Sequence, residues 1–264
     1  MKSYHCALVT GASSGLGAEF ARQLAGRCRI LVLTARRETL LTRLTDELLL
    51  DYPDLHVVSV PADITEAEDR ERVLEVCRSE GFEPDLLVNN AGLGDYGEFL
   101  DSEWSKVEAM LRVNIEALTA MAHGVAPLMA GNGGGDIINV SSLASLMPIP
   151  DFAVYAATKA YVSSFSEAIR LELRGHGIHV TALCPGPVHT EFGDVARRGD
   201  PKEESLFREW AYVDAPTVVH EALAGVWTNR PRVYPGLKIA AAAVVLGLVP
   251  LAIMRLVMSS RPRR

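Results

Sequence analysis

The sequence predicts an α/β protein built on one doubly wound parallel sheet. Short apolar runs rich in β-branched residues alternate with longer segments whose apolar residues recur at helical spacing. Runs of this kind suit strands that helices cover on both faces. A glycine-rich turn follows the first run, and the 264 residues suffice for one large domain. We see no second domain.

Six strands are expected, each a near-continuous apolar run: Cys6–Thr10, Ile30–Thr34, His56–Pro61, Leu86–Asn89, Asp136–Val140 and His179–Cys184. The segments between them predict helices over Ala18–Gly26, Arg37–Tyr52, Glu66–Gly81, Glu103–Ala130 and Tyr155–Gly175. Right-handed crossovers would then give a doubly wound sheet. Asp214 and Pro216 are a typical cap and first turn for one more helix, continuing to Gly225.

Composition excludes several classes of protein. Apolar residues make up 48% of the chain and charged residues 22%, so a large core is available and disorder is not expected. The net charge of −7 offers no electrostatic attraction to nucleic acid. The cysteines form no CxxC pair, which disfavours a zinc site or a disulfide framework. We therefore expect a cytoplasmic protein in a reducing compartment, without metal.

The turn between the first strand and the first helix has the spacing GxxxGxG. Glycine lets the backbone turn tightly and approach a pyrophosphate, whose negative charge the helix N-terminus favours. The alternative is an ordinary strand–helix turn. We expect a dinucleotide to contact Gly11, Ser13, Ser14, Gly15, Leu16 and Gly17.

The end of the second strand indicates which dinucleotide binds. A protein that prefers NAD usually has Asp or Glu here to bind the ribose hydroxyls. This chain has Arg36 and Arg37, whose planar guanidinium groups suit a 2′-phosphate, so NADP(H) is expected. The alternative is that both arginines are only solvated. Asp63 would either accept a hydrogen bond from the adenine amino group or cap the helix that begins near Thr65.

Tyr155 and Lys159 are four residues apart in a helical segment, so both side chains share one face. A free tyrosine has a pKa of about 10. A nearby ammonium group and an oxidised nicotinamide would stabilise its phenolate and suit it to proton transfer. Ser142 follows the fifth strand and could hydrogen-bond the substrate oxygen. The pair alone is weak evidence; its order after the glycine turn, Asn89–Gly92 and Asn114 makes it strong.

Through these motifs the chain resembles the short-chain dehydrogenase/reductase (SDR) family over nearly all of Tyr4–Gly236. The resemblance implies a Rossmann-like fold and NADP(H)-dependent hydride transfer between nicotinamide and a carbonyl or secondary alcohol. It implies a catalytic tetrad of Asn114, Ser142, Tyr155 and Lys159. It also implies that the cofactor contacts Asn90, Ala91, Gly92, Tyr155, Lys159, Pro185, Gly186, Val188 and Thr190.

By the same resemblance, Tyr155 exchanges a proton with the substrate oxygen, while Lys159 binds the nicotinamide ribose and lowers the tyrosine pKa. Ser142 orients the carbonyl, and Asn114 positions a water that links Lys159 to solvent. The competing hypothesis is a non-catalytic NADP(H)-sensing or scaffold protein on the same fold. Such proteins typically lack the tyrosine or the lysine, and this chain has both.

The substrate has no motif of its own. We expect specificity to lie in Thr190–Tyr212, with Phe192 and Met147–Ile149 lining an apolar pocket. The expected partners are a small apolar carbonyl or alcohol substrate and further copies of the chain, as a homodimer or homotetramer.

Residues 237–264, here called the tail, differ from the catalytic domain 1–236. Ile239–Met254 carries no charge and is followed by Arg255, Arg261, Arg263 and Arg264. A helix over Ile239–Met254 would be about 24 Å long, against roughly 30 Å for a bilayer core, and Pro250 would interrupt it. Three alternatives follow: a span over Leu237–Met258, peripheral membrane contact with arginines at the headgroups, or packing against the protein's own surface or a sister subunit.

Overall fold

The computed structural model describes residues 2–196 and 212–259. Seven strands, all parallel, form one sheet in the order β3-β2-β1-β4-β5-β6-β7. This is the Rossmann-like doubly wound sheet that the sequence predicts. The strands are β1 (Tyr4–Thr10), β2 (Cys28–Ala35), β3 (His56–Pro61), β4 (Leu86–Asn89), β5 (Gly135–Val140), β6 (Ile178–Leu183) and β7 (Arg232–Val233).

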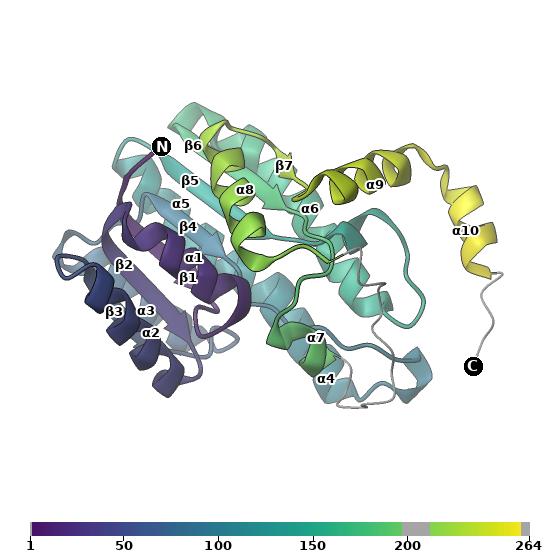
Figure 1. Cartoon of the computed structure of the whole chain (residues 1–264), viewed down its shortest axis with the longest axis horizontal. Coiled ribbons are helices and arrows are strands. Elements are labelled where there is room, and N and C mark those ends of the chain that lie inside the picture. Colours follow the sequence, from purple (N-terminus) through teal and green to yellow (C-terminus); the bar gives the residue numbers. More distant parts are fainter. Residues whose placement is uncertain (1, 197–211, 260–264) are drawn as a thin grey trace.

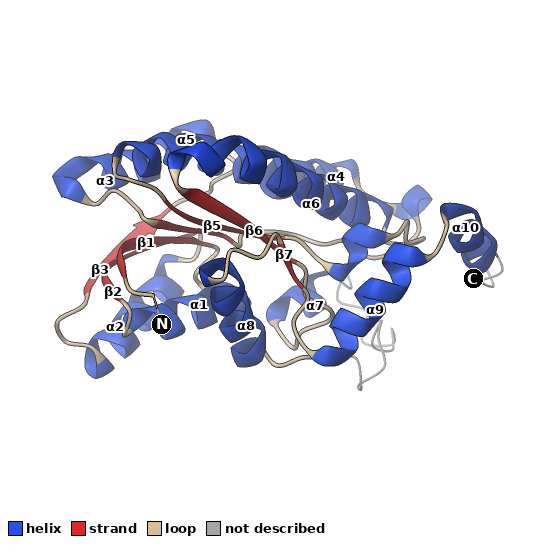
Figure 2. Ribbon diagram, turned by 90° about the horizontal axis from the view of Figure 1, so that it is seen from above, coloured by secondary structure: helices blue, strands red, loops and turns tan. Residues whose placement is uncertain are grey.

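Helices cover both faces of the sheet (Figures 1 and 2). One face carries α3 (Ala67–Arg78), α4 (Trp104–Leu111), α5 (Leu118–Gly131) and α6 (Ala153–Leu173). The other carries α1 (Gly15–Ala25), α2 (Glu38–Asp51) and α8 (Ala215–Trp227). The remaining helices are α7 (Glu191–Ala196), α9 (Leu237–Leu248) and α10 (Leu251–Ser259).

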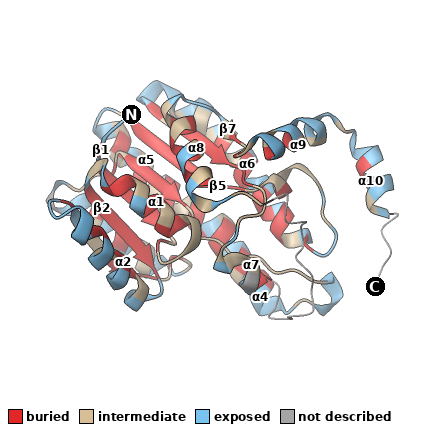
Figure 3. Cartoon of the chain, in the orientation of Figure 1, coloured by how far each residue is buried: buried red, intermediate tan, exposed pale blue. Residues whose placement is uncertain are grey.

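The central strand β1 shows why its sequence is a continuous apolar run. Successive side chains of a strand point to opposite faces, so Ala7 and Val9 join the core beneath α1 and α8, while Cys6 and Leu8 join the core beneath α3 and α5. Both faces are therefore buried, and Figure 3 shows the sheet as the buried centre of the molecule.

Several elements differ from the sequence prediction; α7, for example, was not among the expected helices. The expected helix Glu103–Ala130 is two helices, α4 and α5, joined by a π-helical segment over Arg112–Ala117. β7 is an additional strand of two residues, too short to show a periodic pattern. α8 continues past Gly225 to Trp227, where its buried face still contacts the core.

The sheet reverses its strand order between β1 and β4, and ligands of open α/β sheets bind beside such a point. Val9 of β1 pairs with Leu33 of β2 on one side and with Val88 of β4 on the other. The glycine turn after β1, the arginines after β2 and the Asn89–Gly92 segment after β4 therefore meet at one edge of the sheet.

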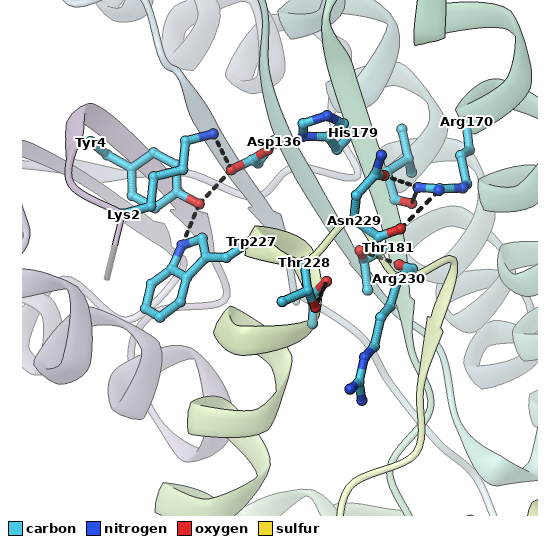
Figure 4. A network of polar contacts seen from close by, with 12 residues as sticks. Lys2, Tyr4, Asp136, Arg170, His179, Thr181, Trp227, Thr228, Asn229 and Arg230 are labelled. Carbon is cyan, nitrogen blue, oxygen red and sulfur yellow. Dashed lines mark hydrogen bonds and ion pairs between the residues drawn. The ribbon is translucent and has the colours of Figure 1, made fainter.

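At the opposite edge of the sheet, where the parallel strands begin, a buried carboxylate joins several elements (Figure 4). The side chain of Asp136 is fully buried and accepts hydrogen bonds from Lys2 Nζ (2.6 Å) and Tyr4 Oη (2.6 Å). His179 Nδ1 lies 3.0 Å from its second oxygen. Trp227 Nε1 donates to Tyr4 Oη at 2.9 Å, so α8 joins the same network.

The tail forms α9 and α10 rather than one helix, because the chain bends by 107° near Pro250. α9 packs against the 3₁₀ turn Leu143–Leu146, and the tail extends away from the sheet on the side of α4 and α7 (Figure 1). Over the described residues, no unbroken helix has both the length and the apolarity to cross a bilayer; α9 and α10 meet that criterion only when taken together across their bend.

Candidate active site

The glycine turn is packed too tightly for side chains. A Cβ on Gly17 would lie 2.6 Å from Asn90 Nδ2 and closer still to the carbonyl oxygen of Gly11. Gly15 has φ = +55°, a conformation that favours glycine. The turn also opens α1, whose first turn contains no acidic residue. Its backbone is therefore shaped to receive an anion at the helix N-terminus.

Thr10 and Asn90 hold this turn against the end of β4. Asn90 Nδ2 donates to the carbonyl oxygens of Thr10 (3.0 Å) and Gly11 (3.2 Å). The Thr10 hydroxyl accepts from the backbone N–H groups of Asn90 and Ala91. These bonds place the segment Asn89–Gly92 directly beside the glycine turn.

The two arginines after β2 have different surroundings. Arg37 donates to Ser14 Oγ (2.7 Å) and Ser13 Oγ (3.3 Å), and it forms an ion pair with Glu191 (2.8 Å). Arg36 lies 3.9 Å from Asp63, and 64% of its side chain is exposed. Arg36 would therefore break fewer existing bonds than Arg37 if its guanidinium turned toward a phosphate.

Asp63 does not cap α3, as one of its two expected roles required, because the N-cap of α3 is Glu66; it stabilises the turn before that helix instead. Its Oδ1 accepts from the backbone N–H (3.0 Å) and the hydroxyl (2.7 Å) of Thr65. α3 itself begins two residues later, at Ala67. The second oxygen faces Arg36, and a contact with adenine stays a prediction.

The four residues of the expected tetrad come from three elements. Ser142 follows β5, Tyr155 and Lys159 lie in the first two turns of α6, and Asn114 lies in the π-helical segment. Asn114 Nδ2 donates to the Leu93 carbonyl (2.9 Å) and to Thr158 Oγ1 (3.0 Å), and its Oδ1 accepts from Leu93 N–H (2.9 Å). Its side chain thereby fastens the segment after β4 to α6.

Lys159 is buried, with 3% of its surface exposed. Its ammonium donates to the Val140 carbonyl oxygen at 2.8 Å and lies 5.7 Å from the Tyr155 ring centre. A Cβ on Gly92 would lie 3.4 Å from this ammonium. Burial lowers the pKa of Lys159 to about 8, because removal from water disfavours the charged form.

Tyr155 is also buried. Burial raises its pKa to about 12, which a hydrogen bond with Ser142 partly offsets. The net shift of the Tyr155 pKa is upward, so the phenol is protonated at neutral pH. The Tyr155 ring stacks on Phe152 at 4.2 Å between ring centres, with 22° between the planes. The hydroxyl of Ser142 also accepts from Ala144 N–H at 3.1 Å.

The buried ammonium of Lys159 should destabilise the fold, even though the expected chemistry requires this lysine. We expect Lys159→Met to raise the free energy of unfolding at pH 7 by about 2 kcal/mol, the cost of the lowered pKa less one hydrogen bond. The lysine pKa is below its ordinary value of 10.5, so its penalty is complete below about pH 8 and fades as pH rises toward 10.5. Urea unfolding at pH 7 and pH 10 measures the gap; a variant less stable than the native chain at pH 7 would contradict this expectation.

The segment after β6 lies over the glycine turn. The Pro185 carbonyl accepts from Leu143 N–H (2.8 Å), and Gly186 follows it. Val188 pairs with Val213. A Cβ on Gly15 would contact the Thr190 side chain at 3.3 Å. Residues 197–211 of the expected specificity segment lie outside the described residues.

Aromatic side chains surround Tyr155, and the sequence indicated only one of them. Phe192 of α7 lies 5.5 Å from the Tyr155 ring centre, as its place after Thr190 suggested. Phe152 and Tyr96 complete the group, with ring centres 5.9 Å apart. Tyr96 comes from the loop after β4, far from α6 in sequence, so no local pattern connects it with Tyr155.

Comparison with known proteins identifies this arrangement. A family model described as short chain dehydrogenase matches residues 5–200. The chain belongs to the short-chain dehydrogenase family. It is 34% identical to sulfoacetaldehyde reductase 2 of Chromohalobacter salexigens, over 86% of this chain and 93% of that protein. It is 33% identical to a very-long-chain 3-oxoacyl-CoA reductase of Podospora anserina, over 85% and 74%.

Solved structures of the family share this fold. A short-chain dehydrogenase from Sphingobium yanoikuyae in complex with NADPH has a TM-score of 0.82 and 30% identity, covering 98% of this chain and 97% of that one. A bulky-bulky ketone specific alcohol dehydrogenase from Comamonas testosteroni has a TM-score of 0.78 and 28% identity, covering 98% and 95%. The chain is therefore an oxidoreductase of this family.

Proposed function

We propose that this oxidoreductase transfers a hydride between NADP(H) and a carbonyl or secondary alcohol, with Tyr155 as the acid or base. The observation that carries the proposal is the meeting of Ser142, Tyr155 and Lys159 at the same sheet edge as the glycine turn. Ser142 interacts with the Tyr155 hydroxyl closely enough to offset part of the rise in the Tyr155 pKa. A substrate oxygen between them would accept a hydrogen bond from each of the two hydroxyl groups. The buried Lys159 would lie on the cofactor side, next to Gly92.

The described residues fit a dinucleotide. Gly11, Gly15 and Gly17 let the chain turn tightly at the start of α1, where a pyrophosphate would bind. The hydroxyl groups of Ser13 and Ser14, which now accept from Arg37, lie in the same turn. The ribose that lies toward Lys159 would contact Asn90, Ala91 and Gly92. The carboxamide end of the nicotinamide would be held by Pro185, Gly186, Val188 and Thr190. When bound, the nicotinamide supplies or accepts the hydride. The chain's residues supply placement and electrostatics.

Proton transfer is the role proposed for the side chains of this site. In carbonyl reduction, the Tyr155 hydroxyl donates its proton to the oxygen that is becoming an alkoxide, and Ser142 holds that oxygen by a second hydrogen bond. The reverse reaction requires the Tyr155 phenolate, which a protonated Lys159 stabilises. Asn114, whose side chain fixes Leu93 and Thr158, would keep α6 in register and hold a water on the path from Lys159 to solvent.

The choice of NADP(H) over NAD(H) rests on Arg36. Solved relatives include an L-sorbose reductase with NADPH but also a 3-ketoacyl-ACP reductase with NADH, so cofactor preference varies within the fold. We expect Arg36→Ala to raise the KM for NADPH about tenfold, because one charge-assisted bond to the 2′-phosphate is lost. The KM for NADH should change little.

Arg43→Ala is the matched control, since Arg43 is an exposed arginine on α2, the helix that follows Arg36. Steady-state kinetics with both cofactors gives the comparison. Equal loss with NADPH and NADH in the Arg36 variant would refute a 2′-phosphate contact at this residue.

The substrate is proposed to be a small apolar ketone or alcohol, since Phe152, Phe192 and Tyr96 surround Tyr155. Loss of NADPH absorbance with a panel of aliphatic and aromatic ketones tests the proposal. Cofactor binding without turnover on any ketone would instead support the sensing or scaffold alternative.

We also propose a cytoplasmic homodimer or homotetramer. The four cysteines are all free thiols, which fits a reducing compartment. Trp104 on α4 and Leu171 on α6 are 69% and 72% exposed, and large exposed apolar side chains are common at subunit contacts. Tyr161 and Phe165, also on α6, stack on each other.

A further inference from the structure

We propose that the tail binds the surface of an anionic lipid bilayer and holds the catalytic domain there. The proposal concerns α9, α10 and the basic residues that follow them. It is independent of the proposed reaction, because none of its residues belongs to the candidate site.

The outward sides of both tail helices are aliphatic. Leu237, Val244, Val245 and Leu248 share one side of α9 and are 60–91% exposed, while Ile239 and Ala243 on the other side are buried. On α10, Ile253 and Leu256 are three residues apart and 51% and 71% exposed. These six exposed residues are here called the tail face. Figure 3 shows the exposed surface of α9 and α10 beside their narrow buried stripe.

The charge of the tail indicates which kind of partner the tail face binds. The tail, residues 237–264, has five Lys and Arg residues and no Asp or Glu. The whole chain has 26 basic and 33 acidic residues, so residues 1–236 hold 21 basic and 33 acidic ones and carry a charge of −12. An anionic membrane would attract the tail and repel the rest of the chain. The domain would thus be held away from the lipid surface by its own charge.

The residue types also favour lipid over protein. The tail face consists only of leucine, valine and isoleucine. Binding hot spots between proteins are enriched in tryptophan, tyrosine and arginine, with leucine and valine under-represented. Aliphatic helix faces with flanking Lys and Arg are typical of helices that lie in the membrane interface. The 107° bend suits two short helices lying at an interface rather than one helix crossing it.

The tail is also close to the candidate site. α9 packs against the turn Leu143–Leu146, which directly follows Ser142. Figures 1 and 2 place α9 and α10 on the same side of the molecule as α4 and α7. A bilayer bound by the tail would therefore lie near the substrate end of the sheet.

Vesicle flotation of the full-length protein tests the proposal. Vesicles of phosphatidylcholine with about 30% phosphatidylglycerol should bind at least about tenfold more protein than pure phosphatidylcholine, and about 0.5 M salt should reduce the difference. Leu248→Asp combined with Leu256→Asp should lower binding about tenfold or more, because two charges would enter the headgroup boundary. Replacing Arg255, Arg261, Arg263 and Arg264 together by glutamine should remove the preference for anionic vesicles.

Leu50→Asp is the matched control: Leu50 is 84% exposed on α2, away from the tail, and its replacement should leave binding unchanged. Thermal melting confirms that each variant is folded. NADPH turnover with a water-soluble ketone, measured on the same samples, reports on the reaction separately. Absence of vesicle binding overturns the proposal. So does a native oligomer, measured by light scattering, that the double leucine variant dissociates while vesicles bind neither form.

Discussion

We expect Tyr155→Phe to lower kcat for ketone reduction about 10³-fold, within the range of about 10² to 10⁴ for a lost general acid. The variant keeps the ring that stacks on Phe152 and removes only the hydroxyl that meets Ser142. The dissociation constant for NADPH should remain within about twofold, because the glycine turn, Arg36 and Lys159 are all unchanged in this variant. Stopped-flow turnover and fluorescence titration measure the two quantities.

Tyr161→Phe provides the control for this substitution. Tyr161 lies on the same helix, and its hydroxyl bonds only a surface threonine, Thr119, among the contacts found for it (2.9 Å). Its removal should leave kcat unchanged. If Tyr155→Phe retains native turnover, another group supplies the proton and the assignment of Tyr155 is wrong.

We expect Asp136→Ala to lower the free energy of unfolding by about 3 kcal/mol, the cost of removing the acceptor of several charged or buried donors. Tyr4 Oη and Lys2 Nζ would both lose a 2.6 Å bond, and the tyrosine is buried. For a chain of this size the melting temperature should fall by roughly 6–12 °C. Activity per folded molecule should be kept, because Asp136 lies at the far end of the sheet from Tyr155.

Asp54→Ala is the comparison, since Asp54 is an exposed carboxylate in the loop before β3. Its melting temperature should match that of the native chain. Equal melting temperatures for Asp136→Ala and the native chain would mean that the donors find other partners at no cost. Tyr4→Phe should lie between them, because Asp136 then keeps Lys2 and His179.

Much of the fold could be predicted because each main strand has its own signature. β1 to β6 are apolar runs long enough to show in the sequence, and the motifs follow them directly. β7 could not be predicted, because its two residues are held by pairing with Ala182 and Leu183 of β6 rather than by any pattern of their own. The π-helical segment likewise has no sequence signature, although it carries Asn114.

For the candidate site, the sequence placed Tyr155, Lys159, Ser142 and the glycine turn correctly at one sheet edge, because strand order and helix spacing determine that. It could not anticipate that burial raises the Tyr155 pKa to about 12, which depends on the aromatic side chains from three separate segments. The residue types alone also do not distinguish the role of Arg36 from that of Arg37. Only the fold shows that Arg37 is already bonded to Ser14 and Glu191.

The order of the strands has a consequence for the newly synthesised chain. β1, β2 and β3 leave the ribosome first, but the other edge of β1 pairs with β4, where Ala7 meets Leu86. Until that segment emerges, one edge of an apolar strand has exposed backbone groups that another chain could pair with. The bonds from Tyr4 to Asp136 and Trp227 join still later. Strand β1 is thus fully paired and anchored only after much of the chain that follows it has been made, and until then its free edge is open to wrong pairing.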